Sequence, residues 1–269
     1  MSTVSTRRPH SPKVVASDLD GTLVNSEGHI SPRTRKALDR VRDAGALLIF
    51  VTGRPPRWMS QVVAETGASG LAVCANGAMV YDLGSGEVIR QHVLDPVSAG
   101  RLVDAIRAEL PGVTFAVESG SRFAHEPGYV PTWPAPNTAV AEVAVLLRDP
   151  VAKLLVKHPE RGPDEIHPIV AGIAGADANV TYSGNVLLEV SGAGISKAST
   201  LEALCLEYGV APADVIAFGD MPNDVPMLAW AGYGVAVGNA HPSVLAIADE
   251  VTGSNDDDGV AQVLEQLYR

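Results

Sequence analysis

The sequence predicts an α/β fold, in which a second, α+β unit is inserted into a doubly wound, Rossmann-like parallel sheet. Short apolar stretches of strand length alternate with helical patterns between residues 14 and 75. Hairpin-like patterns then replace this alternation, and the first rhythm resumes after Gly194. Alternating strands and helices are typical of a parallel sheet, whereas hairpins mixed with helices are typical of an α+β unit.

The segments before residue 76 follow the order of a doubly wound sheet. They are a strand at 14–16, a helix from Pro32 to Gly45, a strand at 46–51, a helix from Pro55 to Gly67 and a strand at 71–74. Ser31 suits the N-cap of the first helix, and Pro32 suits its first turn. The unbroken apolar run at 46–51 is expected of a strand covered on both faces.

The inserted unit is predicted from hairpins, and we place it at residues 83–187. The segments predicted after residue 78 are a hairpin at 79–82 and 88–93, a helix at 96–110, strands at 113–118 and 121–125, a proline-rich loop at 127–137, a strand at 151–157, a helix at 164–174, and one or two strands within 180–190. Residues 13–82 and 188–269 then form the core domain, and residues 1–12 are expected to be a disordered tail.

The closing part of the chain returns to the strand–helix rhythm. Its predicted segments are a helix from Lys197 to Gly209, a strand at 215–218, a short helix around Leu228, a strand at 234–237 and a last helix ending near Leu267. This return completes the parallel sheet after the insertion.

Composition narrows the class of protein. The net charge is −11, so the overall field repels nucleic acids and anionic membranes. No stretch of about 18 apolar residues is present, and Arg7-Arg8 is not followed by the apolar run of an export signal. Cys74 and Cys205 both lie in apolar surroundings, which indicates a reduced, cytoplasmic protein rather than a disulfide or a metal site.

Two carboxylates close to the first strand form the most conspicuous local pattern. Asp18 and Asp20 follow the strand two residues apart, and Gly21 permits a tight turn after them. Two ionised carboxylates at this spacing repel unless a cation or a shared proton intervenes, and a divalent metal with oxygen ligands meets that need. The same Asp-x-Asp-Gly pattern also occurs in plain turns and calcium loops.

Further motifs follow in a fixed order. Together they resemble the haloacid dehalogenase (HAD) superfamily, and specifically its Cof-type branch, subclass IIB, with a C2B-type cap. The matching stretches are Asp18-Leu19-Asp20-Gly21-Thr22, Val51-Thr52-Gly53-Arg54, Cys74-Ala75-Asn76-Gly77-Ala78, Ile195-Ser196-Lys197, Gly219-Asp220-Met221-Pro222-Asn223-Asp224 and Val237-Gly238-Asn239-Ala240. The resemblance covers nearly the whole chain from about residue 13, and it implies that the inserted unit is the cap.

The resemblance implies a role for each acidic residue. Asp18 is expected to be the nucleophile and a metal ligand, and Asp20 the general acid, whose backbone carbonyl also binds the metal. Asp220 corresponds to a further metal ligand, and Asp224 to an acidic residue of the metal shell. Mg²⁺ is the expected ion, since it takes few carboxylates and keeps several waters. A turn at Asp220 and a helix cap at Asp224 are the alternatives.

The phosphate is expected to meet a second group of residues. Thr52 and Gly53 offer a hydroxyl and a backbone amide just before a helix N-terminus. Lys197 lies near another helix start, where the helix dipole disfavours a cation, and this placement favours a role in neutralising the phosphate. The resemblance adds Asn223 as a phosphate contact. Arg54 belongs to the match but is equally suited to brace the loop, and Asn76 and Asn239 are expected to support nearby turns.

These features predict a Mg²⁺-dependent phosphatase that hydrolyses small phosphorylated metabolites, with sugar or polyol phosphates as the expected class, through an aspartyl-phosphate. A phosphomannomutase-like sugar phosphomutase and a non-catalytic phosphate sensor are the alternatives. The basic residues of the predicted cap are scattered, whereas a mutase needs several to hold a second phosphate. No single cap residue is favoured for substrate contact among Glu118, Arg122, His125, Tyr129 and Trp133.

Overall fold

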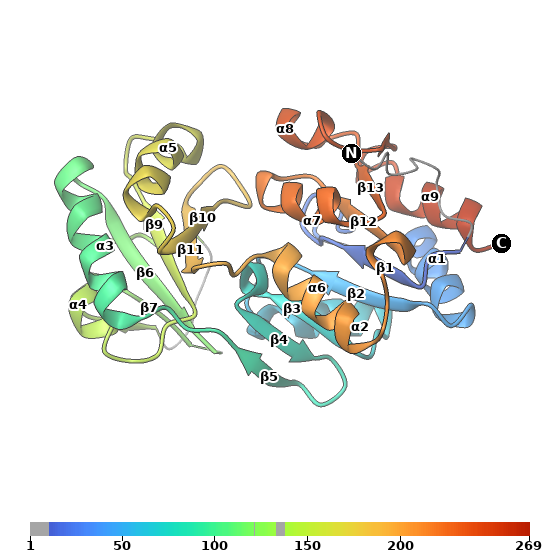
Figure 1. The fold of residues 1–269 in the computed structure, drawn as a ribbon, viewed down its shortest axis with the longest axis horizontal. Helices are drawn as coiled ribbons and strands as arrows, with labels where there is room; N and C mark the ends of the chain where they lie inside the picture. Colours follow the sequence, from blue (N-terminus) through green and yellow to red (C-terminus); the bar gives the residue numbers. More distant parts are fainter. Residues whose placement is uncertain (1–10, 121, 133–137) are drawn as a thin grey trace.

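The computed structural model describes residues 11–120, 122–132 and 138–269, which form two lobes, each built on its own sheet (Figure 1). Most of the predicted tail at 1–12 lies outside the described residues, as do Ser121 and residues 133–137 of the predicted loop. The colours of Figure 1 show that the chain begins in the larger lobe, passes through the smaller one and returns.

The larger lobe holds a mostly parallel sheet. Its strands within the described residues are β1 (Val14–Ser17), β2 (Leu47–Val51), β3 (Leu71–Cys74), β4 (Met79–Asp82), β5 (Glu87–Gln91), β12 (Val215–Gly219), β13 (Tyr233–Ala236) and β14 (Glu250–Val251). They lie in the order β14-β13-β12-β1-β2-β3-β4-β5, and β1 pairs in parallel with both β12 and β2. The antiparallel pairs β3–β4 and β4–β5 add a hairpin at one edge.

Helices connect and cover the parallel strands. They are α1 (Pro32–Asp43), α2 (Met59–Thr66), α6 (Lys197–Glu207), α7 (Val225–Trp230), α8 (Pro242–Leu245) and α9 (Gly259–Leu267). Ser31 caps α1 as predicted, since its Oγ accepts the backbone N–H of Thr34 at 3.0 Å. The helix predicted from Pro55 begins instead as a 3₁₀ turn at Pro56–Trp58, where two consecutive prolines lack the N–H donors of a regular α-helix.

The smaller lobe holds a mostly antiparallel sheet. Its elements are α3 (Pro96–Glu109), β6 (Thr114–Ser119), β7 (Arg122–His125), β8 (Ala139–Val140), α4 (Val143–Leu146), β9 (Lys153–Lys157), α5 (Pro163–Ala174), β10 (Ala178–Thr181) and β11 (Leu188–Gly192). The strand order is β10-β11-β9-β6-β7-β8, and β7–β8 is the parallel pair among the described strands. The two sheets confirm the predicted α/β fold with an α+β insertion.

The two faces of the smaller sheet differ in what they contact. Alternate residues of a strand point to opposite faces, so Leu154 and Val156 of β9 share one face and Lys153 and Leu155 share the other. Leu154 and Val156 join the apolar core that includes α3 and α5. Lys153 turns toward the larger lobe, where its Nζ donates to the carbonyl of Gly53 at 2.9 Å. The face away from the helices therefore meets the larger lobe.

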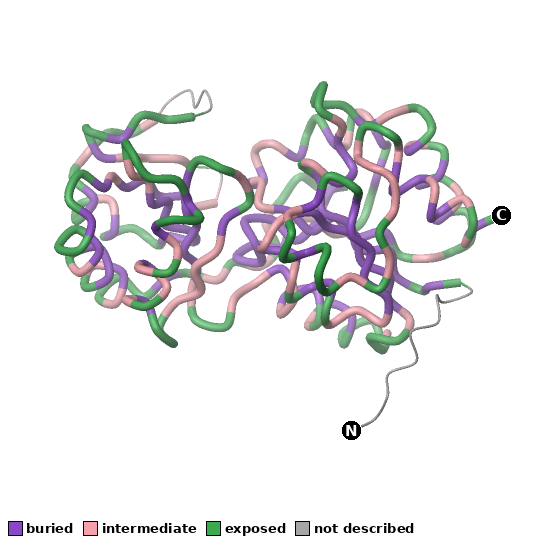
Figure 2. The backbone as a smooth tube through the Cα atoms, turned by 90° about the horizontal axis from the view of Figure 1, so that it is seen from above, coloured by how far each residue is buried: buried purple, intermediate pink, exposed green. Residues whose placement is uncertain are grey.

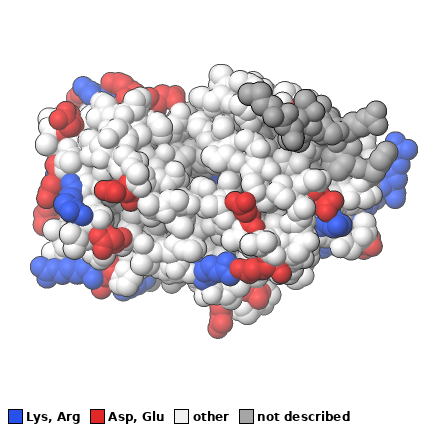
Figure 3. Space-filling view, in the orientation of Figure 1, with Lys and Arg blue, Asp and Glu red and all other residues white. Residues whose placement is uncertain are grey.

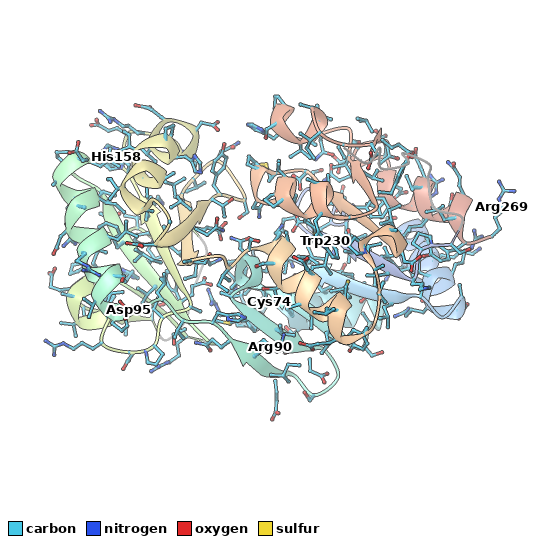
Figure 4. All side chains as sticks on the ribbon, viewed as in Figure 1. Cys74, Arg90, Asp95, His158, Trp230 and Arg269 are labelled. Atoms are coloured by element: carbon cyan, nitrogen blue, oxygen red, sulfur yellow. The ribbon has the colours of Figure 1, made fainter. Side chains whose placement is uncertain are left out.

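The strand pairing places the crossings between the lobes slightly later in the chain than the predicted boundaries at 83 and 187. Strand β5 belongs to the larger sheet, and Arg90 lies on it (Figure 4). Arg90 Nη2 donates to Glu207 Oε1 of α6 at 2.7 Å. Strand β11 belongs to the smaller sheet, because it pairs with β9 and β10. We therefore propose domain boundaries in the linkers at 92–94 and 193–196.

Each lobe has its own apolar core, and the buried stretches of the backbone run through the middle of both (Figure 2). The larger core includes strands β1, β2 and β12, whose residues are almost all buried. Cys74 and Cys205 are buried free thiols, as predicted, and burial raises the pKa of Cys74 to about 12. Both cysteines therefore behave as packing residues.

Charged side chains are spread over the face shown in Figure 3, where acidic and basic groups alternate without a large patch of one sign. Among the residues that the structure describes, no helix combines the length and apolar character needed to cross a membrane.

Candidate active site

Three predicted site residues follow three neighbouring strands. Asp18 comes directly after β1, Thr52 after β2 and Asp220 after β12, and β1 lies between the other two strands in parallel register. The carboxyl ends of parallel strands meet at one edge of the sheet, where open α/β sheets bind ligands. The sheet topology therefore gathers side chains that lie up to 202 residues apart in the sequence.

The central feature of this edge is a group of buried charges, here called the core charge set: Asp18, Lys197, Asp220 and Asp224. Their exposed fractions lie between 0 and 6%. Lys197 Nζ donates to Asp18 Oδ1 and to Asp224 Oδ1, both at 2.7 Å. One oxygen from each of the three aspartates lies within 4.8 Å of the others. Three carboxylates thus lie around one ammonium group, which bonds to two of them, in a largely buried space.

Backbone and hydroxyl groups hold the aspartates in place. Asp224 Oδ2 accepts the backbone N–H groups of Asp220 and Met221 at 3.1 and 3.0 Å, so both of its oxygens have partners. Thr22 Oγ1 donates to Asp220 Oδ1 at 2.7 Å. Gly21 has a φ of 82°, and a Cβ at this residue would collide with Asp220 Oδ2. Glycine is therefore needed here both for the turn and for the space.

The surroundings shift the protonation of this set. Burial raises the pKa of Asp18 well above its ordinary value, although Lys197 acts in the opposite direction. Burial and the charge of Asp224 raise the pKa of Asp220 to about 7. Burial alone would lower the pKa of Lys197, but Asp18 and Asp224 hold it above its ordinary value. The one positive charge of Lys197 therefore does not compensate the three carboxylates of the core charge set.

The donor set fits a divalent cation of the hard, oxygen-loving kind. All of its candidate ligands are carboxylate oxygens, and the absence of a side chain at Gly21 leaves room beside Asp220. A divalent ion would balance the charge that Lys197 leaves uncompensated. Asp18 and Asp220 are the residues best able to hold it, because the oxygens of Asp224 are already engaged.

Asp20 lies apart from the core charge set. Its side chain is 54% exposed and forms a two-pronged ion pair with Arg54, with distances of 2.7 and 2.6 Å from Nε and Nη2. From the sequence, Arg54 was equally suited to a role in the site and to bracing its own loop. In the structure it holds the carboxylate that the resemblance assigns to proton transfer, and so fixes the position of Asp20 at the mouth of the site.

Of the residues expected to hold phosphate, Lys197 bonds to Asp18, whereas Thr52, Gly53 and Asn223 lie in the loops after β2 and β12. Thr52 is fully buried, and its Oγ1 accepts the backbone N–H of Arg54 at 3.0 Å. A Cβ on Gly53 would lie 3.1 Å from Ser183 Oγ, so the larger lobe and the smaller lobe approach closely here. Asn223 Nδ2 donates to Asn76 Oδ1 at 3.0 Å, which ties the loop after β12 to the loop after β3.

Asn239 supports the first turn of the site, as the sequence suggests. Its Nδ2 donates to the carbonyl of Gly21 at 2.8 Å, and its Oδ1 accepts the backbone N–H of Asn255 at 2.9 Å. Asn239 thereby links the connection between β14 and α9 to the loop that carries Asp18 and Asp20.

A pocket opens from this edge toward the smaller lobe. Its volume is about 240 Å³, at the small end of ligand pockets, and both lobes contribute to its walls. Asp18, Asp20 and Arg54 line it from the larger lobe, whereas Phe123 and Leu187 are among the residues that line it from the smaller one. A phosphate bound beside Asp18 would therefore leave the rest of its molecule in contact with the smaller lobe.

Arg57 of the larger lobe and three buried charged residues of the smaller lobe, Glu118, Lys153 and Glu189, also line this pocket, and these four residues are here called the cap charge set. Arg57 Nη2 donates to Glu118 Oε1 at 3.0 Å, and Lys153 Nζ lies 2.5 Å from Glu189 Oε1. Burial alone would raise the pKa of Glu189, but the charge of Lys153 lowers it below its ordinary value. Two cations and two carboxylates make this set neutral.

Sequence reasoning found part of the cap side of the pocket. Glu118 and Tyr129 line it, Arg122 and His125 do not, and Trp133 lies outside the described residues. The list of basic cap residues contained Lys153 but treated them all as scattered. Phe123 and Glu189 of the smaller lobe, and Arg57 of the larger lobe, are among the lining residues that were missed. The signal for Glu189 was present in strand β11, where charged Glu189 alternates with apolar Leu188 and Val190.

Comparison with known proteins agrees with this geometry. The family model of haloacid dehalogenase-like hydrolases matches residues 15–264. A 5-amino-6-(5-phospho-D-ribitylamino)uracil phosphatase of Bacillus subtilis is 29% identical over 264 residues, which cover 96% of this chain and 98% of the relative. A pyridoxal phosphate phosphatase of Escherichia coli is 29% identical over 267 residues, with 94% and 97% covered.

A solved structure of a HAD-superfamily phosphatase from Bacteroides thetaiotaomicron has the same fold. It matches with a TM-score of 0.81 and 26% identity, and 99% of each chain is covered. The family model, the relatives and the fold agree with the motifs gathered around Asp18, and the chain belongs to the haloacid dehalogenase-like hydrolase family.

Proposed function

We propose that this hydrolase is a Mg²⁺-dependent phosphatase of small phosphorylated metabolites, which acts through an aspartyl-phosphate on Asp18. The observation that carries the proposal is the core charge set, in which Asp18 is buried at the end of β1 with Lys197 Nζ at 2.7 Å. The named activities of the relatives, on an aminouracil compound and on pyridoxal phosphate, support this class of substrate.

The residues divide the reaction between them. An oxygen of Asp18 attacks phosphorus, the ester P–O bond breaks, and Asp20 gives a proton to the leaving alcohol. Asp20 then takes a proton from a water that attacks phosphorus, and the bond from phosphorus to Asp18 breaks to release phosphate. Because Asp20 is held by Arg54 in this structure, it has to leave that ion pair before it can donate a proton.

Electrostatic positioning supplies the rest of the catalysis. Lys197 neutralises charge between Asp18 and the phosphoryl oxygens, and Thr52, Gly53 and Asn223 orient the phosphoryl group. Asp18, Asp220 and the Asp20 carbonyl would hold Mg²⁺, with Asp224 supporting them; the ion, when bound, supplies charge that offsets the phosphate and carboxylate oxygens.

The pocket favours a phosphatase over a mutase. The three cationic side chains among the described residues that line it are Arg54, Arg57 and Lys153, and each is paired with a carboxylate. A second phosphate would have to break one of these pairs, at a considerable cost for the buried ones. A substrate with one phosphate and an uncharged body meets no such barrier. The buried free thiols of Cys74 and Cys205 support a reducing, cytoplasmic setting.

A phosphate-release screen tests the proposal. The full chain is incubated with Mg²⁺ and a panel of sugar, polyol, nucleotide and cofactor phosphates, beside an Asp18→Asn variant as a control. We expect free phosphate from at least one small ester without any bisphosphate activator, and none from Asp18→Asn. Dependence on a sugar bisphosphate would support the mutase instead, and no release across the panel would support a phosphate sensor.

A further inference from the structure

A lysine of the smaller lobe makes a hydrogen bond to the backbone of the larger lobe. Lys153 of β9 is only 2% exposed, and its ammonium donates to the carbonyl of Gly53, in the loop after β2, at 2.9 Å. Inside its own lobe the ammonium already pairs with Glu189 and lies 3.8 Å from Glu118 Oε2. Charge balance within the cap charge set therefore does not explain why Lys153 also contacts Gly53.

The contact completes the pairing of three consecutive carbonyl groups. The Thr52 carbonyl accepts the backbone N–H of Asn76 at 3.0 Å. The Arg54 carbonyl accepts the backbone N–H of Ala75 at 2.9 Å. The carbonyl between them, that of Gly53, has the cap lysine as its partner. Two of the three partners thus come from the core and one from the cap, so the loop is fully held only when the two lobes are in contact.

The same three residues leave one backbone donor free. The N–H of Thr52 donates to the Val73 carbonyl at 2.8 Å, and the N–H of Arg54 donates to Thr52 Oγ1 at 3.0 Å. The N–H of Gly53 donates to no other residue that the structure describes, and Gly53 lines the pocket together with Asp18. A backbone N–H in this position can donate to an oxygen of the phosphoryl group.

The core side of this arrangement is held rigidly. Ala75, Asn76 and Gly77 all have positive φ values, of 52, 56 and 100°. For residues with a Cβ this left-handed conformation is strained, and it persists because the surroundings enforce it. A Cβ at Gly77 would lie 2.2 Å from the carbonyl oxygen of Ser196, so the turn packs tightly against the start of α6. The two N–H groups that hold the loop are therefore fixed in place.

Gly53 is the most flexible residue of the loop. Because it has no Cβ, the peptide units on both of its sides can rotate more freely than at any other residue type. The unit before it is fixed by the N–H of Asn76, and the unit after it by Lys153. Without Lys153 the Gly53 carbonyl loses its partner, so the second unit can turn about Gly53 and the loop around the free N–H loses its fixed shape.

We propose, resting on the proposed phosphatase function, that Lys153 is a positioning residue for phosphoryl transfer. By holding the Gly53 carbonyl, it fixes the loop so that the Gly53 N–H donates to the phosphoryl group of the bound substrate. The contact joins the two lobes, so the donor is aligned when the cap lies against the core. Lys153 therefore acts on the phosphoryl group, which every substrate shares, rather than on the substrate body.

The test removes the contact without leaving a buried charge unpaired. Lys153→Met combined with Glu189→Gln takes one charge of each sign from the cap charge set, which stays neutral. Hydrolysis of p-nitrophenyl phosphate, sorbitol 6-phosphate and pyridoxal phosphate is measured with Mg²⁺, together with inhibition by vanadate, a phosphoryl analogue that has no substrate body. We expect kcat/KM to fall by a common factor of about 10 for each ester that the wild type hydrolyses, and vanadate to bind about 10-fold more weakly.

The matched control removes an ion pair of the smaller lobe that does not line the pocket. Arg107→Met combined with Glu126→Gln should leave kcat/KM and vanadate inhibition unchanged. If Lys153→Met with Glu189→Gln does not fold, Lys153→Gln with Glu189→Gln takes its place. Its two amides can hydrogen-bond to each other, and the shorter side chain at residue 153 ends before the Gly53 carbonyl.

Two results would overturn the proposal while leaving the phosphatase function intact. One is unchanged vanadate inhibition in a well-folded variant. The other is a loss of kcat/KM that differs several-fold between the esters, which would show that Lys153 acts on the substrate body. If the wild-type protein released phosphate from none of the three esters, that result would instead count against the phosphatase function itself.

Discussion

Asp18 of the core charge set and all four residues of the cap charge set line one pocket, and the two sets differ in charge balance. The core set has three carboxylates for one ammonium, whereas the cap set has two of each sign. Burying an uncompensated charge is costly, so a protein keeps such a site where a ligand restores the balance. Under the proposed function, a divalent cation would offset the excess negative charge of the core set, whereas the cap set is already balanced in charge.

The largest expected effect follows from making the core imbalance worse. Lys197→Met leaves Asp18 and Asp224 without their shared cation, so we expect kcat/KM to fall by about 10³-fold and the free energy of unfolding to fall by about 3–5 kcal/mol. Steady-state kinetics and urea unfolding measure the two losses.

Replacing the buried lysine of the cap charge set tests whether the two sets have different roles. Lys153→Met should cost similar stability, because Glu189 loses its partner, yet it should lower kcat far less than Lys197→Met. Equal losses of kcat in the two variants would show that the two sets do not have separate roles.

The two sets should also respond to pH in opposite directions when metal is removed by a chelator. Asp220 has a pKa of about 7 in the fold against 3.8 as its ordinary value, so its contribution to stability is full below pH 4 and is lost as the pH rises to about 7, on the order of 2–4 kcal/mol. Glu189 has a lowered pKa, so its contribution is present above pH 4.5 and is lost as the pH falls below that value.

Thermal unfolding across pH measures both trends. Asp220→Asn should flatten the change of Tm between pH 5 and 7, and Glu189→Gln should flatten the change below pH 4.5. If the Tm of the metal-free wild-type protein rose between pH 5 and 7, the excess of negative charge that we assign to the core charge set would be contradicted.

A smaller effect is expected from the metal itself. Mg²⁺ at about 100 times its Kd should stabilise the protein by about 2.7 kcal/mol. The gain should vanish in Asp220→Asn and persist in Glu189→Gln, because only the first residue belongs to the core set. Calorimetric scans with and without Mg²⁺ measure it, and stabilisation that survives in Asp220→Asn would place the ion elsewhere.

The smallest effect concerns the turn that supports the core set. Gly21→Ala puts a side chain into a left-handed conformation and against Asp220, so we expect a loss of about 1–2 kcal/mol in the free energy of unfolding and a weaker response to Mg²⁺. Gly28→Ala is the control, since Gly28 also has a positive φ of 83° but has open space around it. Equal responses to Mg²⁺ in Gly21→Ala and Gly28→Ala would show that the contact between a side chain at residue 21 and Asp220 does not affect the metal site.

The two lobes also differ in how far the sequence predicts them. In the larger lobe, Asp18, Thr52 and Asp220 each follow an apolar strand, and parallel topology brings strand ends together, so order along the chain was enough to predict the site. The ion pair of Asp20 with Arg54 was not predicted, because a side-chain partner depends on local geometry that no spacing rule contains.

In the smaller lobe, the pattern predicted strands but not their partners. Glu118 and Lys153 lie 35 residues apart and face each other only through the β6–β9 register, which hydrophobic periodicity does not determine. The short elements α4, α8, β8 and β14 also went unpredicted, since two to four residues carry no periodic signal. Specificity residues on such a sheet become visible only when the pairing is known.

The most direct test of the account is to locate the phosphoryl group on the protein during turnover. An Asp20→Asn variant is mixed with p-nitrophenyl phosphate, whose leaving group needs no proton, then quenched in acid, reduced with borohydride and mapped by mass spectrometry. We predict that the phosphoenzyme accumulates, because water activation by Asp20 is lost, and that reduction converts position 18 to homoserine. Modification of another carboxylate, or release of phosphate with no labelled peptide at any time, would contradict the central role of Asp18.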